Sequence, residues 1–274
     1  MKQATIKIVI YMFLVTLLII CIIPFYLMLI NGTRSAADIN TGISFIPGKY
    51  LIQNYKTITK ELDFFTGLKN TAFICTVIMI ISSYVAGLTA FSLVFYDYRF
   101  KKTIFAIILG TLMIPQALGL IGYFDLCVKL NILDTLMAII FSGCANASSV
   151  FFLRQYTESV IPPAIIQAAR VDGASELGIY HRIGIPMMLP GMASIGIFAF
   201  VFNWNNYILP LIIISSEEKY TITMTIQKLN STVYFVDYGA VYLGIGLSII
   251  PIIIVFSIFS KAIIQGIAGG SLKE

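Results

Sequence analysis

IPPAIIQAARVDGASELGIYHRIGIPMMLPG, the stretch from Ile161 to Gly191, carries the strongest local structural signals in the chain. Pro162 and Pro163 suit the first turn of a helix, where a missing backbone N–H costs nothing. The residues that follow, up to Val171, are good helix formers, and Gly173 is a natural helix stop. The stretch therefore predicts two short helices that meet at an angle.

Other residues of the same stretch carry further expectations. Asp172 is expected to cap the second short helix, because a carboxylate can accept hydrogen bonds from the free N–H groups of a first helical turn. Ala168 and Ala169 are small and would let another protein approach closely. Pro186 and Pro190 are expected to mark the points at which the chain returns from this stretch to the long apolar sequence that follows.

The composition around this stretch is strongly apolar. Of 274 residues, 58% are hydrophobic and 11% are charged, and the mean hydropathy is +0.92. A soluble domain carries about 25% charged residues, because its surface must face water. Most of the surface of this chain must therefore face lipid, and the composition predicts a polytopic membrane protein.

Six apolar runs have the roughly 20 residues that a transmembrane helix needs. The expected spans are 7–30, 70–95, 103–123, 134–153, 190–214 and 239–263. These runs predict an all-α membrane protein with six transmembrane helices in one domain, 1–274. The first run is expected to be a retained anchor, because its 23 apolar residues from Ile8 to Ile30 exceed the roughly 7–15 of a signal peptide.

The basic residues of the loops indicate an orientation. With the N-terminus inside, the inner segments carry 10 Lys and Arg in 57 positions, against 8 in 75 for the outer segments. Because cytoplasmic loops are enriched in Lys and Arg, both termini are expected on the cytoplasmic side of the cell membrane.

Several functional classes are disfavoured. The net charge of +5 is spread thinly and forms no basic face with interleaved aromatics, so we expect no nucleic-acid partner. Four separated cysteines and one histidine suggest neither a metal site nor a catalytic cluster. A secondary transporter usually carries ionisable residues inside its spans, and the six runs contain almost none.

The opening stretch resembles the EAA loop of bacterial ATP-binding-cassette (ABC) importer permeases. The family pattern is E-A-A, three residues, G, nine residues and I-x-L-P. The matching positions here are Gln167, Ala168, Ala169, Gly173, Ile183, Gly184, Ile185 and Pro186, with Asp172 in the fuller string AARVDGAS. Gln167 stands where the pattern has Glu, which puts in doubt any salt bridge made by that Glu. Ile185 replaces Leu, a milder change.

Three more segments resemble the maltose-type branch of carbohydrate-uptake permeases, in the same order along the chain. They are ISFIPGKYLIQNYKTI at 43–58, FNWNNYILPL at 202–211 and KAIIQGIAGGSLKE at 261–274. This resemblance implies a type I ABC importer permease fold, with a cytoplasmic coupling loop at about 154–189. It also implies that the chain is a membrane subunit through which a sugar or related polyol is imported.

The resemblance further implies partners. These are a second permease subunit, two ATPase subunits that bind ATP and Mg, and an external sugar-binding protein. This chain is then expected to be no enzyme and to hold no cofactor, since its nearest phosphate-loop string, Gly42 to Tyr50, departs from G-x-x-x-x-G-K-[ST]. The residues implied in ATPase coupling are Gln167, Ala168, Ala169, Asp172, Gly173, Ile183 and Pro186. An importer of a glycerol phosphate ester stays open as an alternative, and a secondary transporter fits less well.

Polar residues in the fifth expected span are candidates for the substrate path. Asn203, Asn206 and Tyr207 would share one face of a continuous helix by their spacing. Amides and an aromatic ring suit a neutral polyhydroxylated ligand, but amides in spans also hold helices together. Gln116 and Asn146 are weaker candidates for the same path.

Overall fold

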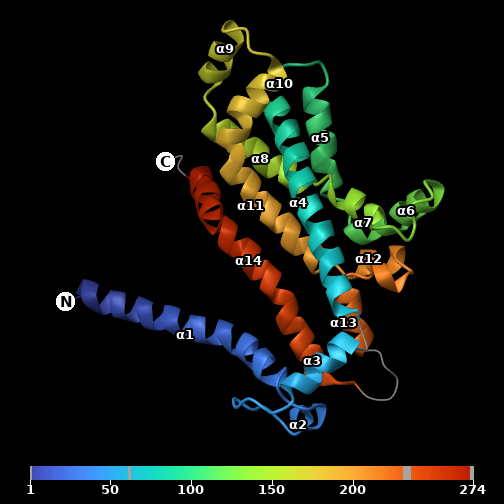
Figure 1. Cartoon of the computed structure of the whole chain (residues 1–274). Helices are drawn as coiled ribbons and strands as arrows, with labels where there is room; N and C mark the ends of the chain where they lie inside the picture. The colour runs from blue at the N-terminus through green and yellow to red at the C-terminus, as the bar shows by residue number, and fades with distance from the viewer. Residues whose placement is uncertain (1, 61–62, 231–235, 272–274) are drawn as a thin grey trace. The chain divides into compact units, whose positions relative to one another are not determined.

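The computed structural model describes residues 2–60, 63–230 and 236–271, and every regular element within these ranges is a helix (Figure 1). The side chains of 2–5, 116, 230 and 262–271 lie outside the description. The expected all-α class is confirmed for the described residues. Two compact units divide the chain: Met1–Gly67 with Met224–Ile250, and Leu68–Thr223 with Pro251–Glu274. The expectation of a single domain stays a prediction.

The first unit is built from the N-terminal helices and the segments that follow residue 223. It contains α1 (Lys2–Asn31), α2 (Ala36–Asn40), α3 (Leu51–Lys60) and parts of α13 (Ile222–Asn230) and α14 (Tyr238–Ser271). Its small core joins Ile58 of α3 to Leu229, Ala240 and Val241. Buried Asn54 donates to the carbonyls of Gly32 and Arg34, at 2.8 and 3.0 Å, and so fastens α3 to the end of α1.

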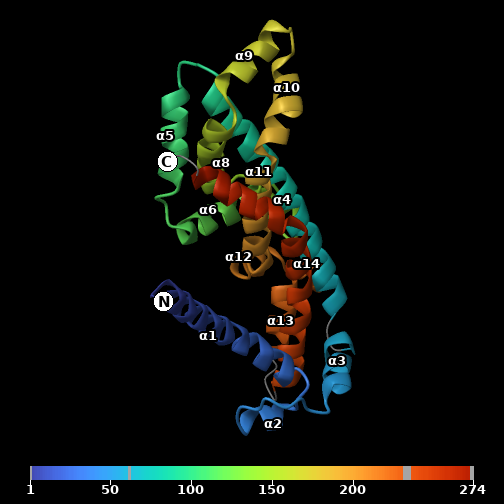
Figure 2. The same cartoon turned by 90° about the vertical axis from the view of Figure 1, so that its left-hand side faces the viewer.

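The second unit contains most of the remaining helices (Figure 2). They are α4 (Phe64–Phe95), α5 (Lys101–Thr111), α6 (Gln116–Lys129), α7 (Leu136–Gly143), α8 (Ala147–Val160), α9 (Pro163–Val171), α10 (Glu176–Ile179), the π-helix η1 (Tyr180–Gly184), α11 (Ile185–Trp204), α12 (Ile208–Ile213) and the 3₁₀-helix η2 (Glu217–Lys219). Helix α8 packs against α5 and α11, and α12 packs against α6 and α7.

Small residues let the helices of the second unit approach closely. A Cβ added at Gly191 of α11 would lie 2.6 Å from the Tyr156 ring of α8, so only glycine fits there. Ser83 Oγ of α4 donates to the carbonyl of Met192 at 3.2 Å. Close approach and interhelical hydrogen bonds are the usual means of association for helices in lipid, where hydrophobic burial between them gains little.

Within the described residues, four helical segments are long and apolar enough to cross a membrane. They are Ile6–Asn31, Phe64–Phe95, Glu176–Trp204 and Tyr238–Lys261, and the bent pair α7–α8, with 41° between its helices, could form a fifth. The third expected span, 103–123, is not one helix, because α5 ends at Thr111 and α6 begins after Pro115. The count of six spans stays a prediction.

The helix expected at 190–214 has different bounds. It begins at Glu176, continues through η1 and ends at Trp204, so α10 is not a separate short helix. Pro186 lies in the first turn of α11 and Pro190 lies inside it; neither ends the helix, contrary to the expectation. Such prolines are tolerated in apolar helices where local π-type turns and neighbouring groups satisfy the freed backbone.

Candidate functional site

A tight, hydrogen-bonded turn follows α9 in the second unit. The N–H of Ala174 donates to the carbonyl of Ala169 at 3.0 Å, and the N–H of Gly173 donates to the carbonyl of Arg170 at 3.1 Å. This pair of bonds is a Schellman motif, which needs a left-handed residue after the helix, and Gly173 has φ +77°. The expected helix stop at Gly173 is confirmed. We call residues 169–175 the Gly173 turn.

The cap of the following helix was predicted wrongly. Ser175, and not Asp172, is the N-cap of α10, and its hydroxyl accepts from the N–H of Gly178 at 3.2 Å. Asp172 is instead the C-cap of α9. The Schellman motif adds residues after Asp172 before the chain re-enters a helix, so its carboxylate lies too early in the sequence to cap that helix.

The Gly173 turn is anchored to the core of the second unit on both sides. Ile166 of α9 and Ile179 of α10 are each 1% exposed and belong to one apolar cluster with residues of α4, α8 and α11. Tyr180 is buried there too, with its ring centroid 5.3 Å from that of Phe91 and its hydroxyl donating to the Tyr84 carbonyl. The turn is therefore packed into the same apolar core as α4 and α11.

An ion pair closes the Gly173 turn. Arg170 Nε and Nη2 donate to the two carboxylate oxygens of Glu176, at 2.9 and 3.2 Å. Tyr96 Oη donates to Glu176 at 2.5 Å, and the Arg170 guanidinium lies 5.2 Å from the Tyr96 ring centroid. Burial and the hydrogen bond to Glu176 raise the pKa of Tyr96. The sequence interpretation missed this cluster, because Tyr96 is 74 positions before Arg170 and no local pattern links them.

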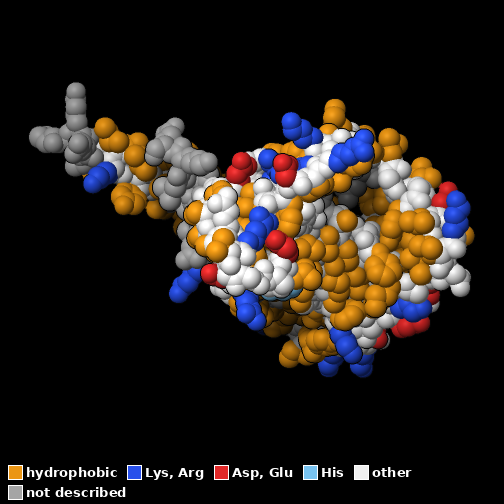
Figure 3. Space-filling view, turned by 90° about the horizontal axis from the view of Figure 1, so that it is seen from above, with side chains coloured by type: hydrophobic (Ala, Val, Ile, Leu, Met, Phe, Trp, Pro, Cys, Tyr) orange, Lys and Arg blue, Asp and Glu red, His pale blue; other side chains and the backbone are white. Residues whose placement is uncertain are grey.

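The residues predicted for coupling occupy two different settings. Gln167, Ala168, Asp172 and Gly173 are exposed on α9 and its turn, and Ala169 is half-buried. Ile183 lies half-buried in η1, and Pro186 is exposed on α11. Figure 3 views the second unit from the α9–α10 end and shows acidic and basic side chains there. The structure thus brings the first four together on one exposed element and leaves Ile183 and Pro186 on the next.

A groove of about 270 Å³ lies between α9 and the ends of α4 and α8. We call it the α9 groove. Its apolar lining includes Phe95, Ile161 and Ile166, while its polar lining consists of Glu158, Gln167 and Arg170. The groove thus joins one residue predicted for coupling, Gln167, to a carboxylate that the sequence interpretation did not single out.

The predicted substrate-path residues lie at a break between two helices. Helix α11 ends at Trp204 and α12 begins at Ile208, so Asn203 and Tyr207 do not share the face of one helix as predicted. Asn203 Nδ2 donates to the Ala199 carbonyl at 2.8 Å. Asn206 Oδ1 accepts from the N–H of Leu209 at 3.4 Å, in the first turn of α12. We call residues 203–207 the α11–α12 break.

The two weaker path candidates lie elsewhere. Asn146 is the N-cap of α8, at the bend after α7, and its Oδ1 accepts from the N–H of Ser149 at 2.9 Å. Gln116 is the first residue of α6, and its side chain lies outside the described residues. Asn146 therefore has a clear structural role at the bend.

Asp134 fixes the segment that follows α12. Its N–H donates to the Ile213 carbonyl at 2.9 Å, and its carboxylate accepts from the N–H groups of Ser215 and Ser216 and from Lys219 Nζ, at 2.9, 2.9 and 3.0 Å. Asp134 adopts φ +55°, which non-glycine residues seldom do. The sequence interpretation missed this contact, which joins positions about 80 residues apart.

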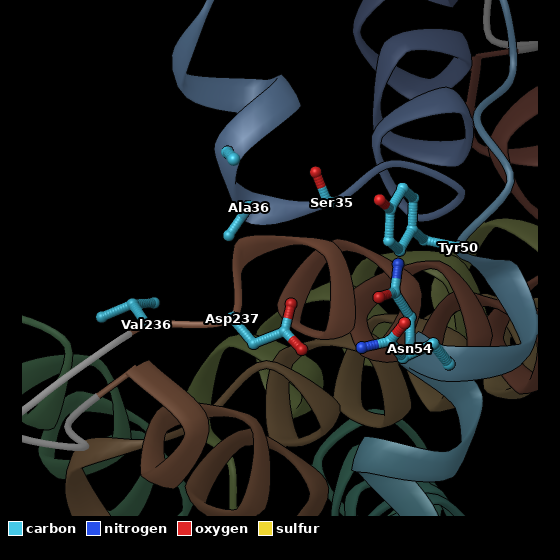
Figure 4. A pocket seen from close by; sticks show the side chains of 8 residues that line it. Ser35, Ala36, Tyr50, Asn54, Val236 and Asp237 are labelled. Atoms are coloured by element: carbon cyan, nitrogen blue, oxygen red, sulfur yellow. The ribbon is translucent and has the colours of Figure 1, made fainter.

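The first unit contains a separate pocket of about 310 Å³ between α2, α3 and the start of α14 (Figure 4). Its lining includes Ser35, Tyr50, Asn54 and Asp237, and Figure 4 shows the Asp237 carboxylate pointing toward Asn54. Asp237 accepts from the N–H of Ala240 at 3.2 Å and so caps α14. In the part of the chain that the structure describes, no group of three or more His, Cys, Asp or Glu could hold a metal ion.

Comparisons with known proteins match nearly the whole chain. A family model described as "Binding-protein-dependent transport system inner membrane component" matches residues 3–269. The chain is 29% identical to the arabinooligosaccharides transport system permease protein AraQ of Halalkalibacterium halodurans, over 93% of this chain and 92% of that protein. It is 30% identical to the lactose transport system permease protein LacG of Rhizobium radiobacter, over 90% of each.

A solved structure shares the fold. One chain of a bacterial ABC transporter involved in the import of the acidic polysaccharide alginate matches with a TM-score of 0.83, covering 95% of this chain and 97% of that chain at 24% identity. The expected ABC importer permease fold is confirmed by this likeness.

Proposed function

Because this chain belongs to the family of binding-protein-dependent transport system inner membrane components, we propose that it is a membrane subunit of a sugar importer driven by a separate ATPase. The proposed substrate is a mono- or oligosaccharide or a related polyol. Support comes from the permeases AraQ and LacG, whose names specify arabinooligosaccharides and lactose.

The observation that carries the proposal is the Gly173 turn. It presents the exposed surface of α9 to a partner, while Ile166 and Ile179 tie the same turn to the core around α4 and α11. An ATPase subunit bound to α9 could therefore move the long helices as a connected body. We assign Gln167, Ala168, Ala169, Asp172 and Gly173 to this contact, with Ile183 and Pro186 transmitting the movement along the helix.

The proposed substrate path passes the α11–α12 break. Non-helical backbone at membrane depth is tolerated where protein or a wet cavity surrounds it, and the break falls in an apolar region that runs uncharged from Ile185 to Ile214. Tyr207 would offer a ring face to the sugar. Asn203 would offer its Oδ1 and Asn206 its Nδ2, the amide atoms that are not used in their bonds to the backbone. Gln116 and Asn146 are proposed as secondary contacts.

The proposed assembly follows from the same family. It contains a second permease subunit, two ATPase subunits that hold ATP and Mg, and a sugar-binding protein outside the cell membrane. Both termini of this chain would lie in the cytoplasm. A phosphate ester is a weaker candidate substrate, because no Lys or Arg occurs between Ile185 and Ile214 to neutralise it.

Reconstitution tests this proposal. The purified chain alone should show no ATP hydrolysis, because it lacks a phosphate-binding loop. Vesicles that contain the chain with its partner permease, ATPase and binding protein should accumulate a labelled oligosaccharide only when ATP is supplied. Competition by unlabelled sugar, and not by glycerol 3-phosphate, should reduce uptake. Uptake driven by an ion gradient without ATP would contradict the proposal.

A further inference from the structure

The α9 groove has the shape and chemistry to receive one long side chain. Its floor is apolar and belongs to the main core, since Ile161 and Ile166 are each 1% exposed. Glu158, Gln167 and Arg170 contribute polar groups to the same groove. Lys and Arg combine an aliphatic stem with a charged head, and they bury the stem along apolar surface while the head stays at a polar edge.

The charged group of the groove that is left to pair with a partner is the Glu158 carboxylate. Arg170 contributes a guanidinium, but it is paired with both carboxylate oxygens of Glu176 and lies over the Tyr96 ring. Glu158 is 54% exposed, and its carboxylate is 3.9 Å from Arg154 Nη2, longer than the 2.7–2.9 Å typical of a charge-assisted hydrogen bond. The Arg154 guanidinium lies over the Phe105 ring, with its carbon 4.6 Å from the centroid. Glu158 can therefore accept a cation from outside.

We propose that the α9 groove receives a Lys or Arg side chain of the ATPase subunit, with Glu158 as its ion-pair partner and Gln167 as a second acceptor. This inference rests on the proposed function, because it assumes that α9 contacts the ATPase. It adds a residue from α8 to the contact surface, outside the Gly173 turn.

The placement of Gln167 gives the inference a specific consequence. Glu158 and Gln167 line the same groove from two different helices, so a carboxylate at either position would lie near the bound cation. Moving the negative charge from residue 158 to residue 167 should therefore preserve the interaction, whereas removing it should not.

The test uses the complete transporter, purified through this chain, with retention of the ATPase subunit measured over a range of salt concentrations. Glu158→Gln should weaken retention roughly twofold to fivefold, the range of partly exposed ion pairs. Glu158→Lys should weaken it about tenfold or more, because two cations would then meet. The double variant Glu158→Gln with Gln167→Glu should recover most of the loss. Asp97→Asn, at an exposed position just after α4, is the matched control and should leave retention unchanged.

The effect of Glu158→Gln should also shrink at high salt, where exposed charges are screened. Equal retention by the Glu158→Lys and unchanged chains would overturn the inference, as would a loss at Glu158 that Gln167→Glu fails to restore. A Glu158→Lys variant that alters lipid co-purification while retaining the ATPase normally would assign the groove to a lipid headgroup instead. Sugar uptake by the unchanged transporter tests the proposed function separately, so the two failures are distinguishable.

Discussion

The Gly173 turn and the α11–α12 break interrupt helices in two different ways. At the Gly173 turn the backbone bonds to itself, through Ala174 to Ala169 and Gly173 to Arg170. At the break the backbone also bonds to itself, through the N–H groups of Asn205 and Asn206 to the carbonyls of Val201 and Asn203, and two side-chain amides add further bonds: Asn203 donates to the Ala199 carbonyl, and Asn206 accepts from the Leu209 N–H. The Gly173 turn needs a left-handed glycine, whereas the break also uses asparagine side chains.

The difference determines which side chains stay free for a partner or substrate. A Schellman motif uses main-chain groups and one left-handed residue, so the Gln167 and Asp172 side chains are not needed to form the turn. At the break, Asn206 Oδ1 already accepts a hydrogen bond from the Leu209 N–H. A path residue there can contribute only the groups that its backbone bond does not use.

The largest expected effect is at Gly173. Gly173→Leu should abolish most sugar uptake while the chain still inserts in the membrane, because φ +77° costs a residue with a Cβ roughly 1–2 kcal/mol. A Cβ there meets nothing within 4 Å, so the penalty is conformational and not a steric clash. Uptake and membrane content should be measured on the same vesicles.

Gly173→Asn is the matched control for that substitution. Asn adopts the left-handed conformation more readily than Leu does, so this variant should keep much of the uptake. Equal loss in the Asn and Leu variants would mean that the surface at Gly173, and not its backbone conformation, is what transport requires.

An intermediate effect is expected at Asn206. Asn206→Ala removes both the acceptor for Leu209 and the amide donor, and it should reduce uptake several-fold, since one neutral hydrogen bond contributes about 0.5–1.5 kcal/mol. Asn206→Ser restores an acceptor for the first turn of α12 but not the amide N–H₂. Uptake should be measured beside assembly of the complex in detergent.

The two variants separate the roles of Asn206. If it contacts sugar, the Ser variant should assemble normally and still transport poorly. Full uptake by the Ser variant would show that the amide only supports the helix, and a parallel loss of uptake and assembly in the Ala variant would agree with that structural role.

The smallest effect is expected at the ion pair that closes the Gly173 turn. Arg170→Lys removes the two-pronged contact with Glu176, but the two side chains are 36% and 48% exposed, and such pairs contribute about 0–1 kcal/mol. Uptake should fall by about twofold or less at low salt. A loss as large as that of Gly173→Leu would mean that the turn depends on side chains after all, and the contrast with the α11–α12 break would disappear.

Composition and neighbouring residues were enough to predict part of the fold and the family. The low charged fraction predicted a helical membrane protein, and the family pattern from Gln167 to Pro186 indicated the family. Gly173 could be recognised as a helix stop because a Schellman motif is formed by a few consecutive residues. The same local pattern could not distinguish Asp172 from Ser175 as the cap, since both residue types cap helices well.

The positions where the long helices break, and the contacts between groups distant in the sequence, could not be predicted from any single segment. The apolar run at 190–214 has a composition that an unbroken helix would share, so hydropathy could not reveal that α11 ends at Trp204. The contacts of Tyr96 with Glu176 and of Asp134 with Ser216 join residues about 80 positions apart. Such contacts depend on the packing of whole helices, which a periodic pattern along one segment does not encode.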